Sequence, residues 1–150
     1  MTIRERQNRI KAIEQMFRAA RASVAHYRRA CQNDPGLLGT AGFRIRDIRD
    51  CHEELEATFL LRVFAEFEGA LQDFWRSGMG RQTSPATRTL LDRIAARCHV
   101  PWTELDRAHQ VRAYRNAIIH EGEAPRATEI ALPEARRHLC LFLSRLPANQ

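Results

Sequence analysis

The first 32 residues hold a helix-forming run without a proline or a glycine, and this run limits the folds open to the chain. Within it, apolar residues recur at steps of three and four. They are Ile10, Ile13, Phe17, Ala20, Val24 and Tyr27. This spacing places them along one side of an α-helix. We therefore predict one long amphipathic helix over residues 2–32, ended by the turn-forming segment 33–42, NDPGLLGTAG.

A second long helix is predicted over residues 47–77, where the segment SGMG ends it. Its apolar residues cover more than one side of the helix. They include Phe59, Leu60, Leu61, Val63, Phe64, Phe67, Leu71, Phe74 and Trp75. A helix that is apolar around much of its circumference is central or covered on two sides. We expect central burial together with a contact to a second subunit.

Three shorter helices are predicted in the second half of the chain. Ser84 in the N-cap position and Pro85 in the first turn predict the start of the first. It ends near His99, because Pro101 disfavours helix at the residue before it. Pro133 begins the last of the three. Its inward-facing residues are Ala135, Leu139, Phe142 and Leu146.

The middle helix begins at the TELD segment, residues 103–106, which resembles a capping box with aspartate in place of glutamate or glutamine. It continues to Ile119 or His120, and Gly122 is placed to be the left-handed residue after its end. The core stripe of this helix consists of Val111, Tyr114 and Ile118.

These elements predict a single all-α domain over residues 1–150, a bundle of four to five helices with two long antiparallel ones. No strand-like alternation or repeat interrupts the pattern. The chain has neither a secretion signal nor an apolar run long enough to span a membrane, so we expect a cytoplasmic protein without a membrane partner. Four scattered cysteines have no metal-ligand spacing, and we expect neither a metal site nor a cofactor.

Charge indicates the class of partner. The net charge is +6, and all but one of the 24 basic residues are arginine, whose planar guanidinium suits phosphate. A basic balance favours polyanions such as RNA or DNA. A GC-rich genome would also replace lysine by arginine, but it would not by itself produce the positive net charge.

The segment 113–122, AYRNAIIHEG, carries the most informative polar residues. At about 100° per residue, Arg112, Asn116 and His120 share one side of the helix, and Arg115 lies at the border between that side and the core stripe. His120 falls in the last turn, where the partly negative helix end favours an imidazolium. Two guanidiniums, one amide and one imidazole therefore gather on one polar face.

Such a face has the groups needed to cleave RNA. A histidine can transfer a proton at cellular pH, and the guanidiniums of Arg112 and Arg115 can hold a phosphate and stabilise developing charge. Asn116 can orient the substrate or fix the imidazole tautomer. The expected reaction is attack of a ribose 2′-hydroxyl on the adjacent phosphodiester.

The stretch RNAIIHEG resembles the Arg-Asn-x-x-x-His motif of HEPN domains, all-helical modules of toxin–antitoxin, phage-defence and RNA-processing systems. LLRVFAEFEGALQDFW is similar to the long second helix of that family, and LPEARRHLCLFLSRLP to its closing helix. The resemblance implies a metal-independent endoribonuclease that leaves a 2′,3′-cyclic phosphate. It also implies a homodimer that brings two motifs together, with an antitoxin or another protein as a possible partner.

Carried over from the family, Arg115 and His120 match the catalytic pair and Asn116 its polar neighbour, with Arg112 expected to bind substrate. Glu66 or Glu68 could be an acidic helper on the second helix, although an ordinary ion pair of Glu66 with Arg62, one turn away, is favoured. In one subgroup a tyrosine that is modified by the antitoxin stands two residues after the histidine. Glycine occupies that position here.

Two other interpretations stay open. One is a non-catalytic module of the same fold that binds nucleotide, RNA or a partner protein. The other is an unrelated helical interaction domain whose arginines reflect base composition.

Overall fold

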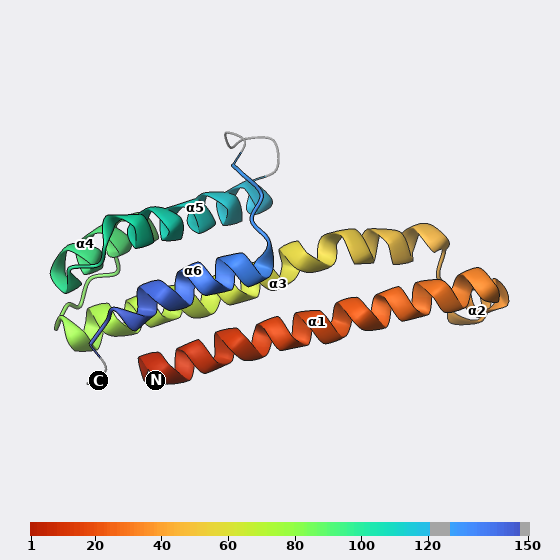
Figure 1. Ribbon diagram of the computed structural model, residues 1–150, viewed down its shortest axis with the longest axis horizontal. Helices are drawn as coiled ribbons and strands as arrows, with labels where there is room; N and C mark the ends of the chain where they lie inside the picture. Colours follow the sequence, from red (N-terminus) through yellow and green to blue (C-terminus); the bar gives the residue numbers. More distant parts are fainter. Residues whose placement is uncertain (121–126, 148–150) are drawn as a thin grey trace.

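The computed structural model describes residues 1–120 and 127–147, and this part of the chain is helical without a strand. The helices in chain order are α1 (Ile3–Asn33), α2 (Gly36–Ala41), α3 (Ile45–Asp73), α4 (Thr87–Cys98), α5 (Trp102–Ile119) and α6 (Leu132–Ser144), with a π-helical turn η1 (Phe74–Gly78) directly after α3. The predicted all-α bundle with two long antiparallel helices is confirmed, because α1 and α3 run antiparallel along the whole molecule (Figure 1). None of the described helices is sufficiently long and apolar to cross a membrane.

The first long helix has the predicted extent, and its start is fixed by a capping box that the sequence analysis did not use. The Thr2 hydroxyl accepts a hydrogen bond from the Glu5 backbone N–H at 3.2 Å, and the Thr2 N–H donates to the Glu5 carboxylate at 2.7 Å. The segment after α1, predicted to be a turn, instead contains the short helix α2. It ends at Gly42, whose φ of 75° favours glycine.

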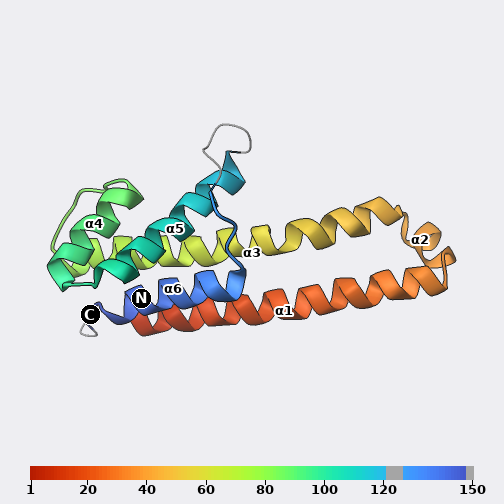
Figure 2. The same ribbon diagram turned by 45° about the horizontal axis from the view of Figure 1, so that its top comes forward.

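Helix α3 is the central element of the bundle. Helices α1, α4, α5 and α6 all pack against it, as the two views in Figures 1 and 2 show. The predicted central burial is confirmed. The side chains that are buried on α3 and η1 are Ile48, Leu60, Val63, Phe64, Phe67, Ala70, Leu71, Phe74 and Trp75. Because other helices of the same chain cover these residues, the wide apolar circumference of α3 does not itself indicate a second subunit.

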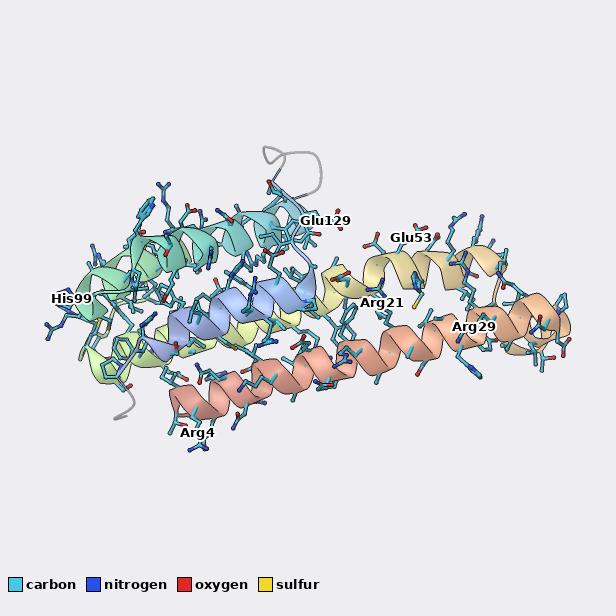
Figure 3. All side chains as sticks on the ribbon, viewed as in Figure 1. Arg4, Arg21, Arg29, Glu53, His99 and Glu129 are labelled. Atoms are coloured by element: carbon cyan, nitrogen blue, oxygen red, sulfur yellow. The ribbon has the colours of Figure 1, made fainter. Side chains whose placement is uncertain are left out.

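Aromatic rings connect α3 to the closing helix at the centre of the core. Phe67 meets Phe142 of α6 edge to face at 5.7 Å between ring centroids, and Phe64 lies 5.8 Å from Phe67. The four residues predicted to face inward on α6 are all buried. Helix α6 covers only the part of the α1–α3 pair nearest the N-terminus, so the outer part, which carries Arg29 and Glu53, extends beyond it (Figure 3).

Two local predictions in the second half were wrong. Helix α4 begins at Thr87 with Ala86 as N-cap, so Ser84 and Pro85 precede it. Helix α5 begins at Trp102, and Asp106, the expected capping acid, instead accepts a hydrogen bond from Gln110 at 2.7 Å. The predicted second helix is helical over its whole range, and from Phe74 it continues as the π-helical turn η1, in which the Met79 N–H donates to the Phe74 carbonyl at 3.2 Å.

Candidate functional site on helix α5

The polar residues of the predicted motif lie outside the core stripe of α5, with His120 exposed and the other three half-buried. Val111 is fully buried, and Tyr114 and Ile118 pack against the core from half-buried positions. The opposite side carries Arg112, Asn116 and His120 at intervals of one turn. We call these three residues together with Arg115 the α5 motif.

Arg115 is held in place by contacts to both its own helix and α3. Its Nη1 donates to Oδ1 of Asn116 at 3.0 Å, and its Nη2 lies 3.9 Å from Oε2 of Glu68. The guanidinium carbon lies 5.5 Å from the centre of the Phe64 ring, a cation–π distance. With 30% of its side chain exposed, Arg115 is fixed on one side and open to solvent on the other.

Glu68 is itself oriented by a third element. Its Oε1 accepts a hydrogen bond from the hydroxyl of Thr87, the first residue of α4. One carboxylate of α3 therefore connects the start of α4 to the guanidinium on α5. Sequence reasoning missed Thr87, and no local pattern identifies it, since the contact depends on how α4 packs.

Asn116 and His120 form the end of the motif. Helix α5 ends at Ile119, as predicted, and the His120 N–H donates to the Asn116 carbonyl at 2.9 Å. His120 is exposed, and its ring makes no hydrogen bond to the described residues. The predicted position of Gly122 lies outside the described residues.

Arg112 is half-buried one turn before Asn116. Within residues 1–120 and 127–147, it has no carboxylate partner and its buried Nε has no hydrogen-bond acceptor. Among these residues its charge therefore has no acidic partner, in contrast to that of Arg115, which has Glu68 nearby. Tyr114, on the core side, holds its phenol proton more firmly than usual, because burial and the negative charges of Glu129 and Glu56 raise the pKa of its phenol.

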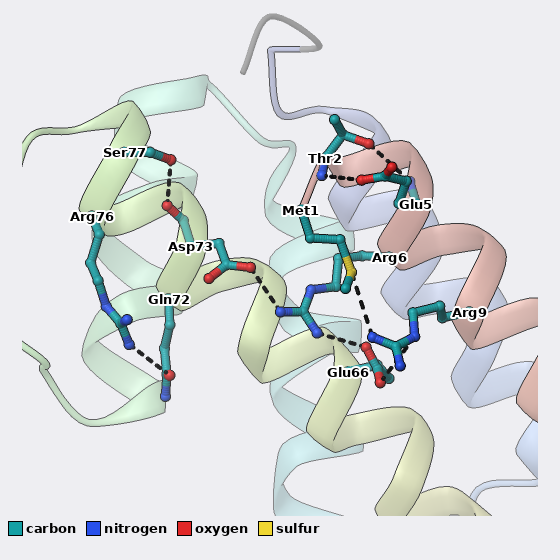
Figure 4. A network of polar contacts seen from close by, with 10 residues as sticks. All are labelled: Met1, Thr2, Glu5, Arg6, Arg9, Glu66, Gln72, Asp73, Arg76 and Ser77. Carbon is teal, nitrogen blue, oxygen red and sulfur yellow. Dashed lines mark hydrogen bonds and ion pairs between the residues drawn. The ribbon is translucent and has the colours of Figure 1, made fainter.

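Glu66 lies on another side of α3 and belongs to a separate network (Figure 4). Its carboxylate accepts a hydrogen bond from Nη1 of Arg6 at 2.7 Å and lies 3.7 Å from Nε of Arg9, both on α1. The predicted pair with Arg62 was wrong, since that guanidinium lies over the Phe59 ring at 5.2 Å. Of the two candidate helpers, the structure brings only Glu68 to Arg115.

The other histidines and tryptophans lie elsewhere. His109 pairs with Asp92 of α4 at 2.7 Å, and His138 is buried in α6. Trp102 is 73% exposed at the start of α5, whereas Trp75 is buried. In the part of the chain that the structure describes, no three His, Cys, Asp or Glu side chains gather where they could hold a metal ion.

Comparison with known proteins identifies no family for this chain. No family model, no curated protein and no solved structure matches the chain. The function therefore has to be argued from the α5 motif and its surroundings.

Proposed function

We propose that the protein is a metal-independent endoribonuclease of the HEPN type, acting as a toxin or phage-defence effector. The observation that supports this most is the grouping of Arg115, Asn116 and His120 at the exposed end of α5, with Arg115 held between Asn116 and Glu68. An oriented guanidinium and an exposed imidazole in the same two turns of a helix can supply the charge stabilisation and the proton transfer that phosphodiester cleavage uses.

In the proposed reaction the ribose 2′-oxygen attacks the adjacent phosphorus while a base removes its proton. The bond from phosphorus to the 5′-oxygen breaks, and that oxygen takes up a proton, which leaves a 2′,3′-cyclic phosphate and a 5′-hydroxyl. His120 transfers the proton, Arg115 stabilises the charge on the phosphoryl oxygens, and Arg112 binds a neighbouring phosphate. Asn116 keeps Arg115 oriented through its side-chain oxygen.

The active form in this proposal is a homodimer in the cytoplasm, with RNA as substrate and an antitoxin or other protein as a candidate further partner. One subunit supplies a single His120, whereas the reaction needs one group that accepts a proton and one that donates it. Two motifs side by side supply both at once. A protein that sediments as a monomer at micromolar concentration would contradict this part of the proposal.

A non-catalytic module that binds RNA or nucleotide is the second candidate, and the contacts of Arg115 favour it. A guanidinium that stacks on Phe64, bonds to Asn116 and lies near Glu68 has the environment of a structural arginine. In such a module Arg112 and the net positive charge would hold the polyanion without breaking it.

An RNA cleavage assay in excess EDTA separates the two candidates. We expect single-stranded RNA to be cut to products that end in a 2′,3′-cyclic phosphate, and the same sequence with 2′-O-methyl riboses to stay intact. His120→Ala should slow cleavage by at least about 100-fold, the usual contribution of a general acid or base. His26→Ala is the matched control, because it removes an exposed histidine of α1. RNA binding without any cleavage would reject the nuclease and leave the binding module.

A further inference from the structure

A pocket lies at the end of the bundle where η1, the loop after it and α4 meet. Its volume is about 810 Å³, within the range of about 300–1,000 Å³ that is typical of small-molecule sites. We call it the η1–α4 pocket. Its polar lining consists of Arg81, Gln82, Thr83, Arg93 and Arg97, and Trp75 forms part of its wall.

The pocket is positively charged without a compensating acid. Residues 74–101 contain five arginines and one aspartate, which gives this segment a formal charge of +4 out of +6 for the whole chain. The one acid, Asp92, does not line the pocket and pairs with His109 of α5 at 2.7 Å. In the described part of the chain, Arg81, Arg93 and Arg97 have no carboxylate within ion-pair distance.

The structure holds these guanidiniums around one space. Arg93 lies over the Trp75 ring at 5.8 Å, and Arg97 follows one turn later on the same side of α4. The backbone N–H of Arg81 donates to the Trp75 carbonyl at 3.2 Å, which ties the loop that carries Arg81 to the end of η1. The Trp75 indole N–H donates to the Thr83 hydroxyl oxygen at 3.3 Å, which leaves the hydroxyl hydrogen of Thr83 available to a ligand.

Like charges one turn apart on a helix repel each other, and an anion between them removes that repulsion. Phosphate suits guanidinium groups because each can donate two parallel hydrogen bonds to its oxygens. The amide of Gln82 and the hydroxyl of Thr83 can bond to the sugar or base of the same ligand. We propose that the η1–α4 pocket binds a phosphorylated nucleoside, either a free nucleotide or the 5′-phosphorylated end of an RNA strand.

This site is separate from the α5 motif. Figure 3 shows His99 at the turn between α4 and α5, and Glu129 at the opposite end of the molecule's upper layer, beyond the end of α5. Helix α5 has 18 residues, so roughly 27 Å separates its two ends. The two sites share no residue, and the pocket can bind its ligand whether or not the chain cleaves RNA.

Calorimetric titration at low ionic strength tests the proposal with three kinds of probe. Adenosine diphosphate tests the free nucleotide, and a short RNA with and without a 5′-phosphate tests the strand end. Adenosine shows how much binding depends on phosphate. We expect at least one phosphorylated probe to bind, and its unphosphorylated counterpart to bind at least about 100-fold more weakly. Each lost ionic hydrogen bond weakens binding by about 1.4 kcal/mol, a factor of ten, and loss of the phosphate removes at least two such bonds. In a Trp102→Phe background, Trp75 is the remaining tryptophan and its fluorescence reports occupancy.

Matched variants distinguish specific binding in the η1–α4 pocket from general attraction of a phosphorylated ligand to a basic protein. Arg93→Gln together with Arg97→Gln should weaken binding by about 100-fold. Arg88→Gln together with Arg137→Gln removes the same charge from exposed positions outside the pocket and should change affinity by no more than about threefold. Thermal melts of each variant establish that it is folded.

His120→Ala should leave nucleotide affinity unchanged, so failure of the nuclease proposal and failure of this one are distinguishable. The proposal is overturned if neither phosphorylated probe binds, if removing the phosphate does not weaken binding, or if both pairs of arginine substitutions weaken it equally.

Discussion

Glu66→Gln should destabilise the protein without affecting RNA cleavage, although Glu66 is only two residues from Glu68. Arg6 connects α1 to two carboxylates of α3, Glu66 at 2.7 Å and Asp73 at 2.8 Å (Figure 4). Its Nε is buried without an acceptor among the described residues, so the guanidinium depends on these two contacts. Glutamine keeps the shape of glutamate, removes the charge and replaces one carboxylate oxygen by an NH2 group, which cannot accept a hydrogen bond.

The exposure of the pair sets the size of the effect. An exposed ion pair contributes about 0–1 kcal/mol, whereas loss of one partner from a buried pair costs about 3–5 kcal/mol. The side chains of Arg6 and Glu66 are 17% and 19% exposed, which lies between these limits but nearer the buried one. Because Asp73 and the glutamine oxygen still accept hydrogen bonds from Arg6, we expect a loss of about 1.5 kcal/mol in the free energy of unfolding.

Urea and thermal unfolding followed by circular dichroism measure this loss. For a domain of this length, about 1.5 kcal/mol corresponds to a decrease of roughly 3–6 °C in Tm. Glu53→Gln is the control, because Glu53 is 64% exposed and lies 3.9 Å from Arg49, and its loss should stay below about 0.5 kcal/mol. Equal losses for the two variants would refute the reasoning from burial. A decrease in cleavage rate for Glu66→Gln at 25 °C would refute its separation from the site.

Two further outcomes are expected. Glu68→Gln should slow RNA cleavage about tenfold without loss of fold, because it removes the charged partner 3.9 Å from Arg115; an unchanged single-turnover rate would exclude Glu68 from the site. Burial lowers the pKa of His138 below its ordinary value of 6.5, with Arg107 and Arg137 adding to the effect against the opposing influence of Glu134. Below pH 6.5 the unfolded chain therefore binds a proton that the folded chain does not. As the pH is lowered from 6.5, the free energy of unfolding should decrease by up to about 1.4 kcal/mol per pH unit. This dependence on pH should be weaker in His138→Gln. An equal change in the urea midpoint between pH 7 and pH 5.5 for the two proteins would contradict the assignment.

The long helices could be predicted from the sequence because apolar spacing alone determines which side of a helix is buried. The apolar residues Ile10, Ile13 and Phe17 are buried as expected. So are Ala135, Leu139 and Phe142 of α6, together with Leu146 just after it. The helix starts were less predictable, since a capping pattern does not fix the residue at which the helix begins. Helix α5 begins at Trp102, before the TELD segment, so Asp106 lies inside the helix and accepts a hydrogen bond from Gln110 one turn later, and the start of α5 has no side-chain cap.

The candidate site was predictable only within one helix. Helical geometry places Arg112, Asn116 and His120 on one side of α5 whatever surrounds it. The acidic neighbour could not be chosen in the same way. Glu66 and Glu68 are separated by about 200° around α3, and which of them faces α5 depends on how α3 is rotated between its neighbours. That rotation is set by the whole core, including the contact of Phe67 with Phe142.

The geometry of the α5 motif therefore depends more on α3 than on the end of α5 itself. In its last two turns α5 has no fully buried residue, and Tyr114 and Ile118 are only half-buried against the core. The ionic contact that connects this end of the helix to the rest of the bundle is that of Arg115 with Glu68, which Thr87 orients from α4. A shift of α3 would thus move Arg115 relative to His120, whose backbone N–H is bonded to the Asn116 carbonyl of α5. Since phosphoryl chemistry depends on the distance between the guanidinium and the imidazole, packing changes on α3 should alter cleavage even where they leave α5 helical.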